Sequence, residues 1–592
     1  MVLHSPSSSA IINVTSILRK GAIFMANMKL YVLTDFPDDC LETYTPDMVD
    51  SLVRQFSEYG FSRLYYQYYG NQEDSYYWTT EWKGWKGNVE TAKIMPNSSR
   101  VFVEACKKYG LEAAAVMRPL EQATWIAFSP YHTRGLQSGL PTIGGKLMDP
   151  TTFLKQHPEL RIKRRSYDVD PGAVNKTIAS IKLYKQNNIP TRIRKENITI
   201  YTSPDNSHYT PYNRDFTFTL SEESAKETVT LSVGTPDYGS KLLTEKGAPI
   251  QVITLGNLEI TDQFVVIGAK CRDTCADEVR FTNTPVNGIA CFDEAGNEIT
   301  SSPGSDIRGT IGGRLHIDEG FNFDDGFGVY STVTLDPDGK EGYIGLAKGK
   351  DLYTRGALCE CEPLVQEYWL SMLEKAMEDG YDFFGNRIEC HAIHVDEPFA
   401  YGYNDCIKEE YFKRYGVCDE KDMELEKIAK IRGDAYTKLF VEGARRVRAK
   451  GKKVYLTLNI EMLHKPIPLD RRYAYPMNVE WQWERWLEEI RPDEINFRMY
   501  KNTPKFLLND PQCQHMLEVA KSYNVPLTVE RYVTPSADMA EEYQMLNETG
   551  IFDAFIVYET ASLFCGTATG EVIPWEKTKT LLPKLKELAE KK

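Results

Sequence analysis

The sequence predicts an α/β protein, a (β/α)8 (TIM) barrel with a β-sandwich domain inserted after its third strand. Three observations lead to this prediction. Short apolar runs alternate with amphipathic helical segments in both flanks of the 592-residue chain. This alternation gives eight strands in all, and eight consecutive βα units indicate a closed parallel sheet. In the central stretch, helical periodicity gives way to short strands separated by turn clusters, which is typical of a sandwich.

The elements before the insertion have local start and stop signals. Thr45 is suited to cap a helix, Pro46 to its first position, and Gly60 to its end. A second helix is expected over 98–109 and ends before Gly110. The three strands that alternate with these helices are expected at 29–36, 63–69 and 112–118.

After the insertion the same alternation returns. The remaining five strands are expected at 388–395, 454–460, 494–499, 527–533 and 554–558. The helices of this part are expected at 363–379, 424–449, 481–490, 513–522, 539–547 and 575–591. A doubly wound open sheet is the alternative, but no G-x-G-x-x-G follows a strand and no G-x4-G-K-[ST] is present.

The expected organisation is a disordered leader at 1–27, a barrel at 28–192 and 348–592, and an inserted domain at 193–347. The basic pair Arg19–Lys20 follows a weakly apolar run, the wrong order for a secretory signal. Met25 and Met28 are therefore alternative starts of the chain.

Composition limits the partners. The formal charge is −14, with 70 basic and 84 acidic residues, which argues against a nucleic-acid partner. No window reaches about 18 uninterrupted apolar residues, so no membrane-spanning helix is expected. The twelve cysteines are thinly spread, which favours free thiols in a reducing, cytoplasmic setting, with secretion left open. Cys359-x-Cys361 and Cys271-x3-Cys275 lack the C-x2-C spacing of a zinc site, so no metal is expected.

Polar side chains cluster at the predicted strand ends. In a barrel the active site lies at the carboxyl ends of the strands, and charged groups there are costly unless they are paired or used. The candidate site residues selected by this rule are Asp35, Tyr69, Arg118, His394, Asp396, Glu397, Asn459, Glu461, Arg498, Tyr500, Glu530 and Glu559.

Two of these carboxylates suit glycoside hydrolysis. That reaction needs one carboxyl group to protonate the leaving oxygen and a second to attack the anomeric carbon or activate water. Glu397 and Glu530 follow strands four and seven, which lie nearly opposite each other in a ring of eight. Glu461 and Glu559 are rivals for the second role.

The run HVDEP at 394–398 resembles the strand-four signature of clan A retaining glycoside hydrolases, the 4/7 superfamily. The Glu of TVERY at 528–532 matches that group's strand-seven nucleophile. The resemblance implies that Glu397 is the acid/base and Glu530 the nucleophile of a retaining mechanism. Asp396 stands where the group usually has Asn, and its charge would raise the pKa of the neighbouring acid.

The other candidates serve binding or orientation. Asp396, Asn459, Arg498 and Tyr500 are expected to bind sugar hydroxyls or orient Glu530. Arg498 or Arg531 is expected to keep Glu530 ionised. Arg118 and Arg498 are expected either to bind a substrate carboxylate or sulfate or to neutralise the candidate glutamates. His391 and His394 are three apart on the expected strand and face opposite sides, which does not favour a shared metal.

The predicted activity is therefore that of a retaining glycosidase that acts on a carbohydrate and needs no cofactor. The sequence is compatible with a homo-oligomer. The aromatic run at 65–85 either stacks sugar rings or packs on the barrel. Two alternatives stay open: a noncatalytic carbohydrate-binding protein on a degenerate barrel, and a sugar lyase or isomerase on the same fold.

Overall fold

A computed structural model describes most of the chain. The described residues are 27–36, 40, 42–68, 86–119, 152–168, 171–185, 188, 190, 191, 193–204, 210–226, 228–232, 240–269, 286–299, 333, 334, 342–348, 352–387, 401–460, 478–499, 502–533 and 538–591. In this part of the chain, no helix combines the length and the apolar character needed to cross a bilayer.

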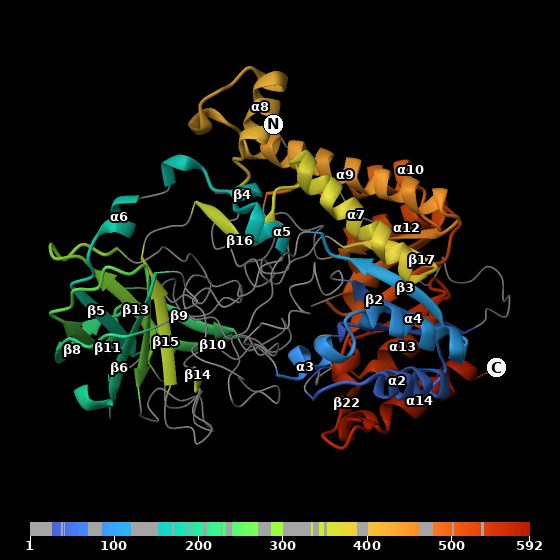
Figure 1. Cartoon of the computed structure of the whole chain (residues 1–592), viewed down its shortest axis with the longest axis horizontal. Helices are drawn as coiled ribbons and strands as arrows, with labels where there is room; N and C mark the ends of the chain where they lie inside the picture. The colour runs from blue at the N-terminus through green and yellow to red at the C-terminus, as the bar shows by residue number, and fades with distance from the viewer. Residues whose placement is uncertain are drawn as a thin grey trace, which may run out of the picture.

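Eight parallel strands close into a barrel, as the sequence predicts (Figure 1). Each strand pairs in parallel with the next, and the last pairs with the first. In barrel order the strands are β1 (Lys29–Thr34), β2 (Phe61–Tyr68), β3 (Glu112–Met117), β17 (Phe383–Asn386), β18 (Lys453–Asn459), β19 (Glu494–Met499), β20 (Leu527–Tyr532) and β21 (Ala554–Tyr558).

Helices surround the barrel, and their ends follow local rules. The Thr45 side chain accepts a hydrogen bond from the Met48 backbone and caps the first long helix, with Pro46 at its first position. Gly110 and Gly380 end two later helices with positive φ angles of 76° and 98°. The longer helices are α2 (Pro46–Glu58), α3 (Lys86–Ile94), α4 (Ser98–Tyr109), α7 (Pro363–Asp379), α8 (Asp405–Tyr415), α9 (Leu425–Ala449), α10 (Trp483–Ile490), α12 (Pro511–Ser522), α13 (Met539–Glu548) and α14 (Leu581–Glu590). A short helix, α11 (Pro504–Asn509), precedes α12.

The fourth strand lies earlier than the sequence predicts. Strand β17 pairs with β3 from Phe383 to Asn386, so the fourth strand of the barrel begins before the expected range of 388–395. Four residues containing a glycine make a weak strand signal. Packing explains the glycine, because a Cβ on Gly385 would lie 2.3 Å from the Tyr455 ring inside the barrel. Residues 388–400 lie outside the described part of the chain.

Two antiparallel sheets lie between β3 and β17 in the chain, which is where the insertion is expected. The strands of one sheet are, in order, β13 (Val286–Phe292), β5 (Ser180–Lys185), β11 (Pro249–Gly256) and β8 (Thr217–Ser224). Those of the other are β14 (Val333–Thr334), β15 (Gly342–Ala347), β12 (Phe264–Ala269), β6 (Ile198–Ser203) and β7 (Thr210–Pro211). A separate two-stranded sheet pairs β10 (Ser240–Thr244) with β9 (Val229–Ser232).

A common buried cluster joins the two larger sheets. It includes Leu183 and Ile253 from one sheet and Ile200 and Val265 from the other. Strand β5 precedes residue 193 yet pairs with both β11 and β13, so the β region begins earlier than the expected boundary. Its standing as an independently folded sandwich domain stays a prediction.

A short ribbon links the insertion to the barrel. Strand β4 (Arg161–Lys163), on the way into the insertion, pairs with β16 (Tyr353–Leu358), on the way back. The ribbon also receives the chain that follows strand four, because Arg164 bridges to Tyr401. The entry, the return and the chain after strand four therefore meet at one place beside the barrel (Figure 1).

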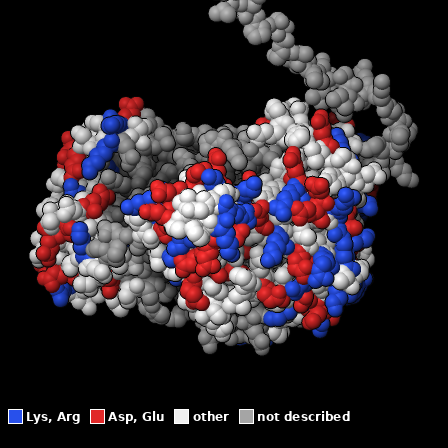
Figure 2. Space-filling model, turned by 90° about the horizontal axis from the view of Figure 1, so that it is seen from above, with Lys and Arg blue, Asp and Glu red and all other residues white. Residues whose placement is uncertain are grey.

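Figure 2 shows basic and acidic side chains interspersed on one face of the molecule. Ion pairs on the outer helices account for part of this mixture. Arg446 of α9, for example, contacts Glu367 and Glu374 of α7 at 2.9 Å each. The described residues of this face form no extended basic surface of the kind that nucleic acid requires.

Candidate active site

Strand alternation sends one set of polar side chains into the barrel. Arg498 on β19 and Glu530 on β20 are direct neighbours in the register, so both point to the same side. Both are buried, with exposed fractions of 0%. Since these residues lie toward the carboxyl ends of their strands, they belong to the end of the barrel where active sites are found.

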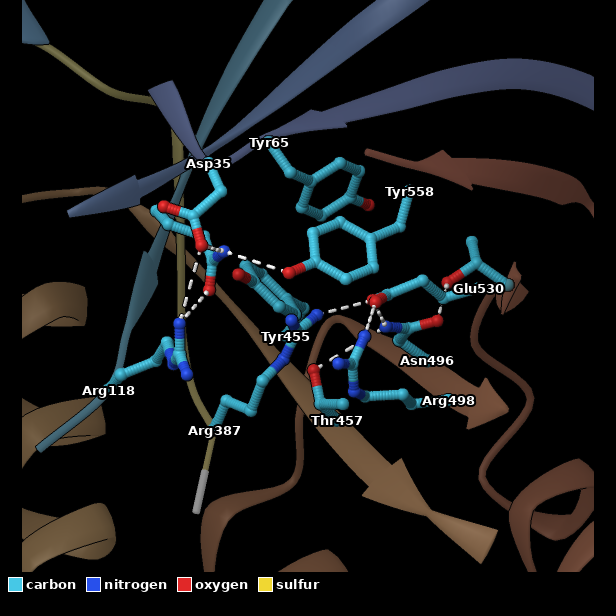
Figure 3. Close-up of polar contacts among 12 residues, drawn as sticks. Asp35, Tyr65, Arg118, Arg387, Tyr455, Thr457, Asn496, Arg498, Glu530 and Tyr558 are labelled. Atoms are coloured by element: carbon cyan, nitrogen blue, oxygen red, sulfur yellow. Dashed lines mark hydrogen bonds and ion pairs between the residues drawn. The ribbon is translucent and has the colours of Figure 1, made fainter. Parts of the chain in front are cut away.

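Glu530 lies at the centre of this group (Figure 3). Arg498 donates to its Oε1 atom, and Arg387 donates to its Oε2 atom. Asn496 Nδ2 donates to the same Oε2 at 3.0 Å. Two guanidinium groups therefore compensate the charge of a carboxylate that has no access to water, and the three donors fix its orientation.

A second polar group lies across the barrel on strands one to three. Gln67 Nε2 donates to Asp35 Oδ2 at 2.5 Å, and Arg118 Nη1 donates to Gln67 Oε1 at 3.1 Å. Arg118 also pairs with Asp35 at 3.5 Å. All three side chains are buried, so Arg118 compensates the charge of Asp35, whereas the sequence suggested a glutamate as its partner.

The Tyr558 ring joins the two groups. Arg498 lies 4.9 Å and Arg387 5.8 Å from its ring centre, both within cation–π range. Gln67 Nε2 lies 3.5 Å from its hydroxyl. Burial raises the pKa of Tyr558 well above its ordinary value, which keeps the phenol neutral and able to donate a hydrogen bond.

The structure separates the two arginines proposed for Glu530. Arg498 contacts it, as expected. Arg531 points to the opposite side of β20 and pairs with Glu542 of α13 at 2.7 Å, so the expectation that it stabilises Glu530 is wrong. Alternation along the strand gives the physical reason, because consecutive residues face opposite sides.

Sequence reasoning missed Arg387. It directly follows the fourth strand and is 3% exposed, and it contacts a glutamate 143 residues away. The expected strand at 388–395 would place Arg387 at the amino-terminal end of the barrel, where no site residue was sought. The available signal was the run Phe383–Asn386, which follows the helix-ending Gly380 closely.

Several expected site residues lie outside the two hydrogen-bonded groups around Glu530 and Asp35. Asn459, at the end of β18, and Glu559, just after β21, are buried at the carboxyl end of the barrel. Tyr65 of the aromatic run lies in β2 and points into the barrel, toward Glu494. The expected residues that lie outside the described part of the chain are Tyr69, His394, Asp396, Glu397, Glu461 and Tyr500, together with 70–85.

Another polar cluster fills the amino-terminal end of the barrel. Arg63 Nη1 lies 2.5 Å from Glu494 Oε2, and the Tyr65 hydroxyl donates to Glu494 Oε1 at 2.5 Å. Arg63 also pairs with the more exposed Glu112 at 2.7 Å. This end of a barrel serves stability rather than catalysis, so we assign these residues to the scaffold.

The sequence matches no family model and no curated protein. Among solved structures, the catalytic domain of a beta-amylase from Paenibacillus polymyxa aligns over 96% of this chain and 100% of that chain, with 6% identity and a TM-score of 0.38. A beta-galactosidase from the psychrophilic Marinomonas ef1 aligns over 90% of this chain and 54% of that chain, with 8% identity and a TM-score of 0.34. A GH18 chitinase from Pseudoalteromonas aurantia aligns over 37% and 67%, with 8% identity and a TM-score of 0.20. Likenesses this distant carry no information about activity, which depends on the side chains of the site.

Proposed function

We propose that the protein is a retaining glycoside hydrolase in which Glu530 is the nucleophile and Glu397 the general acid/base. The observation that carries the proposal is the position of Glu530. It is a buried carboxylate near the carboxyl end of a barrel strand, held by Arg387, Arg498 and Asn496.

This arrangement suits a nucleophile. Attack on an anomeric carbon requires an ionised carboxylate in a fixed orientation. The two arginines compensate the charge of the carboxylate, and their hydrogen bonds limit its rotation. When the glycosyl–enzyme ester is hydrolysed, the same donors stabilise the carboxylate as it leaves, so they assist the second step as well.

The acid/base role of Glu397 rests on chain geometry. The chain leaves β17 at Asn386, and the next residue, Arg387, contacts Glu530. Glu397 follows β17 by eleven residues in the chain, outside the described residues, and the segments that follow the strands of a barrel form its active site. The proposal therefore keeps Glu397 in its expected role after strand four.

Sugar recognition is assigned to the remaining polar residues of the mouth. Asp35, Arg118 and Asn459 are buried near the carboxyl ends of strands one, three and five. We assign hydroxyl binding to them and to Tyr69, His394, Asp396, Glu461, Tyr500 and Glu559. Hydrolysis through a glycosyl ester needs no cofactor, because the two carboxyl groups supply the nucleophile and the proton.

The decisive experiment is covalent trapping. The full chain is first assayed on a panel of chromogenic glycosides, and the 2-deoxy-2-fluoro analogue of the best substrate is then added. A retaining mechanism predicts a stable adduct on the peptide that contains Glu530. Glu530→Gln should form no adduct.

A matched variant guards against a general folding effect. Glu494→Gln changes a buried glutamate at the amino-terminal end of the barrel, where Arg63 and Tyr65 donate to it. This variant should still form the adduct. An adduct on Glu461 or Glu559 would contradict the assignment of Glu530. Turnover with inversion would contradict the retaining mechanism, and sugar binding without turnover on any glycoside would favour a noncatalytic binding protein.

A further inference from the structure

Three cysteines and a glutamate gather beside the barrel, where the inserted segment returns to it. Cys359 and Cys361 follow β16, Glu362 is the N-cap of α7, and Cys406 is the second residue of α8. The sulfur atoms of Cys359 and Cys406 lie 4.0 Å apart, although 47 residues separate them in the chain.

The possible ligand atoms of this cluster are already close together. The ligand atoms of Cys359, Glu362 and Cys406 lie within 4.8 Å of one another, and the Cys361 sulfur lies within the same distance of the Cys359 sulfur. Cys359 is fully buried, and the other three are partly exposed. Cys359 is therefore the residue that these two sets of close ligand atoms share.

Glu360, which lies between Cys359 and Cys361 in the chain, forms an ion pair and is not one of these ligands. The buried Arg432 of α9 contacts both of its oxygens, and the Nη2 to Oε2 distance is 3.0 Å. This pair compensates the charge of Glu360 and anchors the Cys359–Cys361 turn on α9. Glu362 differs, because its side chain makes no capping hydrogen bond to α7.

We propose that Cys359, Cys361, Cys406 and Glu362 bind a structural zinc ion. Thiolates at about 2.3 Å from a tetrahedral zinc ion lie about 3.8 Å from each other. The separation of 4.0 Å between Cys359 and Cys406 is close to that value. A disulfide would require about 2.05 Å.

The ligand chemistry supports zinc in particular. Three thiolates select a soft or borderline metal and disfavour Mg²⁺ and Ca²⁺, which prefer oxygen ligands. The amino-terminal ends of α7, with 17 residues, and α8, with 11, both lie at the cluster. Their dipoles favour the negative charge that bound thiolates carry. Four protein ligands leave no open position, which is the pattern of structural rather than catalytic zinc.

Such an ion would link the two flanks of strand four. Cys359, Cys361 and Glu362 precede α7, which leads into β17, whereas Cys406 lies after β17 in the chain, at the start of α8. Asn404, two residues before Cys406, already connects the start of α8 to β4, since it donates to the Arg161 carbonyl and accepts from the Lys163 backbone, both at 2.8 Å. None of the zinc ligands lies in the barrel mouth, so this inference is independent of the proposed glycosidase activity.

The first test is the metal content of the full chain, purified with added zinc and without chelator. We expect about one zinc ion per chain. Cys359→Ser and Cys406→Ser should reduce the content to background. Cys418→Ser is the matched control, because Cys418 is exposed and belongs to the same chain segment, and it should keep the zinc. A wild-type chain that holds no zinc with its thiols reduced would overturn the proposal.

A second test works on the wild-type chain and does not depend on the folding of variants. Zinc is removed by chelation under reducing conditions, and Co²⁺ is then added. We expect a sulfur-to-cobalt charge-transfer band with the visible bands of tetrahedral cobalt, both lost when Zn²⁺ displaces it. Chelation should also lower the melting temperature, since the ion binds the folded chain. A spectrum without sulfur-to-cobalt bands, or a Cys359–Cys406 disulfide in the peptide map of the chain as purified, would overturn the proposal.

Discussion

The two ends of the barrel interior contain nearly the same ion pair in different surroundings. At the amino-terminal end, Glu494 accepts from Arg63 and Tyr65. At the carboxyl end, Glu530 accepts from Arg387 and Arg498. The two carboxylates lie on neighbouring strands, and both are buried, with exposed fractions of 2% and 0%.

The surroundings separate the two pairs. Aromatic rings enclose Arg63, whose guanidinium carbon lies 3.9 Å from the Phe383 ring centre and 4.5 Å from that of Tyr31. Burial raises the pKa of Tyr31 to about 12, in keeping with a dry environment. Glu530 instead lies next to the point where strand four passes into its loop. A buried arginine–glutamate pair is thus not by itself a sign of catalysis, and its depth along the strands is the informative feature.

Replacement of Glu530 should produce the largest effect. Glu530→Gln removes the proposed nucleophile, and kcat should fall by at least about a thousandfold. Steady-state assays on the best chromogenic substrate measure this loss. Circular dichroism of the same sample shows whether the variant is folded. A folded variant with wild-type kcat would contradict the proposal that Glu530, unlike Glu494, takes part in the reaction.

Replacement of Glu494 should affect stability and spare activity. Glu494→Gln leaves the more exposed Glu112 as the remaining charge partner of the buried Arg63, which should lower the free energy of unfolding by up to about 3–5 kcal/mol. Urea denaturation followed by tryptophan fluorescence measures the change. Per folded molecule, kcat should stay near the wild-type value. A large loss of kcat at full folding would mean that the amino-terminal pair also takes part in the reaction.

Replacement of Arg387 should have an intermediate effect on the reaction. Arg387→Lys keeps the charge but loses the planar donor geometry, and a hydrogen bond to a charged group contributes about 1.5–3 kcal/mol. We therefore expect kcat to fall by about ten- to hundredfold. Arg63→Lys is the matched change at the other end and should lower the melting temperature without lowering kcat. Equal kcat values for the two variants would contradict the role of Arg387.

A carboxylate on the outer surface should contribute least. Hydrogen bonds from Arg445 and Arg446 lower the pKa of Glu442 from 4.5 to about 2. The side chain is partly exposed, so solvent screens these contacts, and Glu442→Gln should change the free energy of unfolding by less than about 1 kcal/mol at pH 7. Because the pKa of Glu442 is lower in the folded chain, its carboxylate stabilises the fold at pH values above its ordinary pKa of 4.5. This contribution is lost as the pH falls from 4.5 toward 2. The difference in melting temperature between wild type and variant should therefore be smaller at low pH. A difference that grows with acid would contradict this sign.

Local signals explain why most elements were predictable. Helices α4 and α7 and strands β19 and β21 begin and end at the expected residues. Helix caps, glycine stops and apolar periodicity act within a few residues, so one sequence is enough to find them. Strand β17 lacked such a signal, because its four residues include a glycine that makes room for a ring from the next strand.

The strand positions of Glu530 and Arg498 were predictable from the sequence, but the hydrogen-bond partners of Glu530 were not. The rule that strand ends form the site selected Glu530 and Arg498, which lie side by side toward the carboxyl ends of β20 and β19. It gave no means of choosing between Arg498 and Arg531 until strand alternation was applied, and it passed over Arg387. Which donor reaches which oxygen depends on how strands four, six and seven are brought together by closure of the barrel.

The sequence by itself determined the repeated βα units and the strand that bears Glu530. These follow from periodicities of two and 3.6 residues, which are properties of neighbours in the chain. Only the tertiary structure decided that Arg387 and Arg498 contact one carboxylate and that Cys406 lies beside Cys359. Both results join residues far apart in sequence, and the physical reason is the same: a parallel barrel pairs strands across long connections, so the positions of their ends depend on the closed structure as a whole.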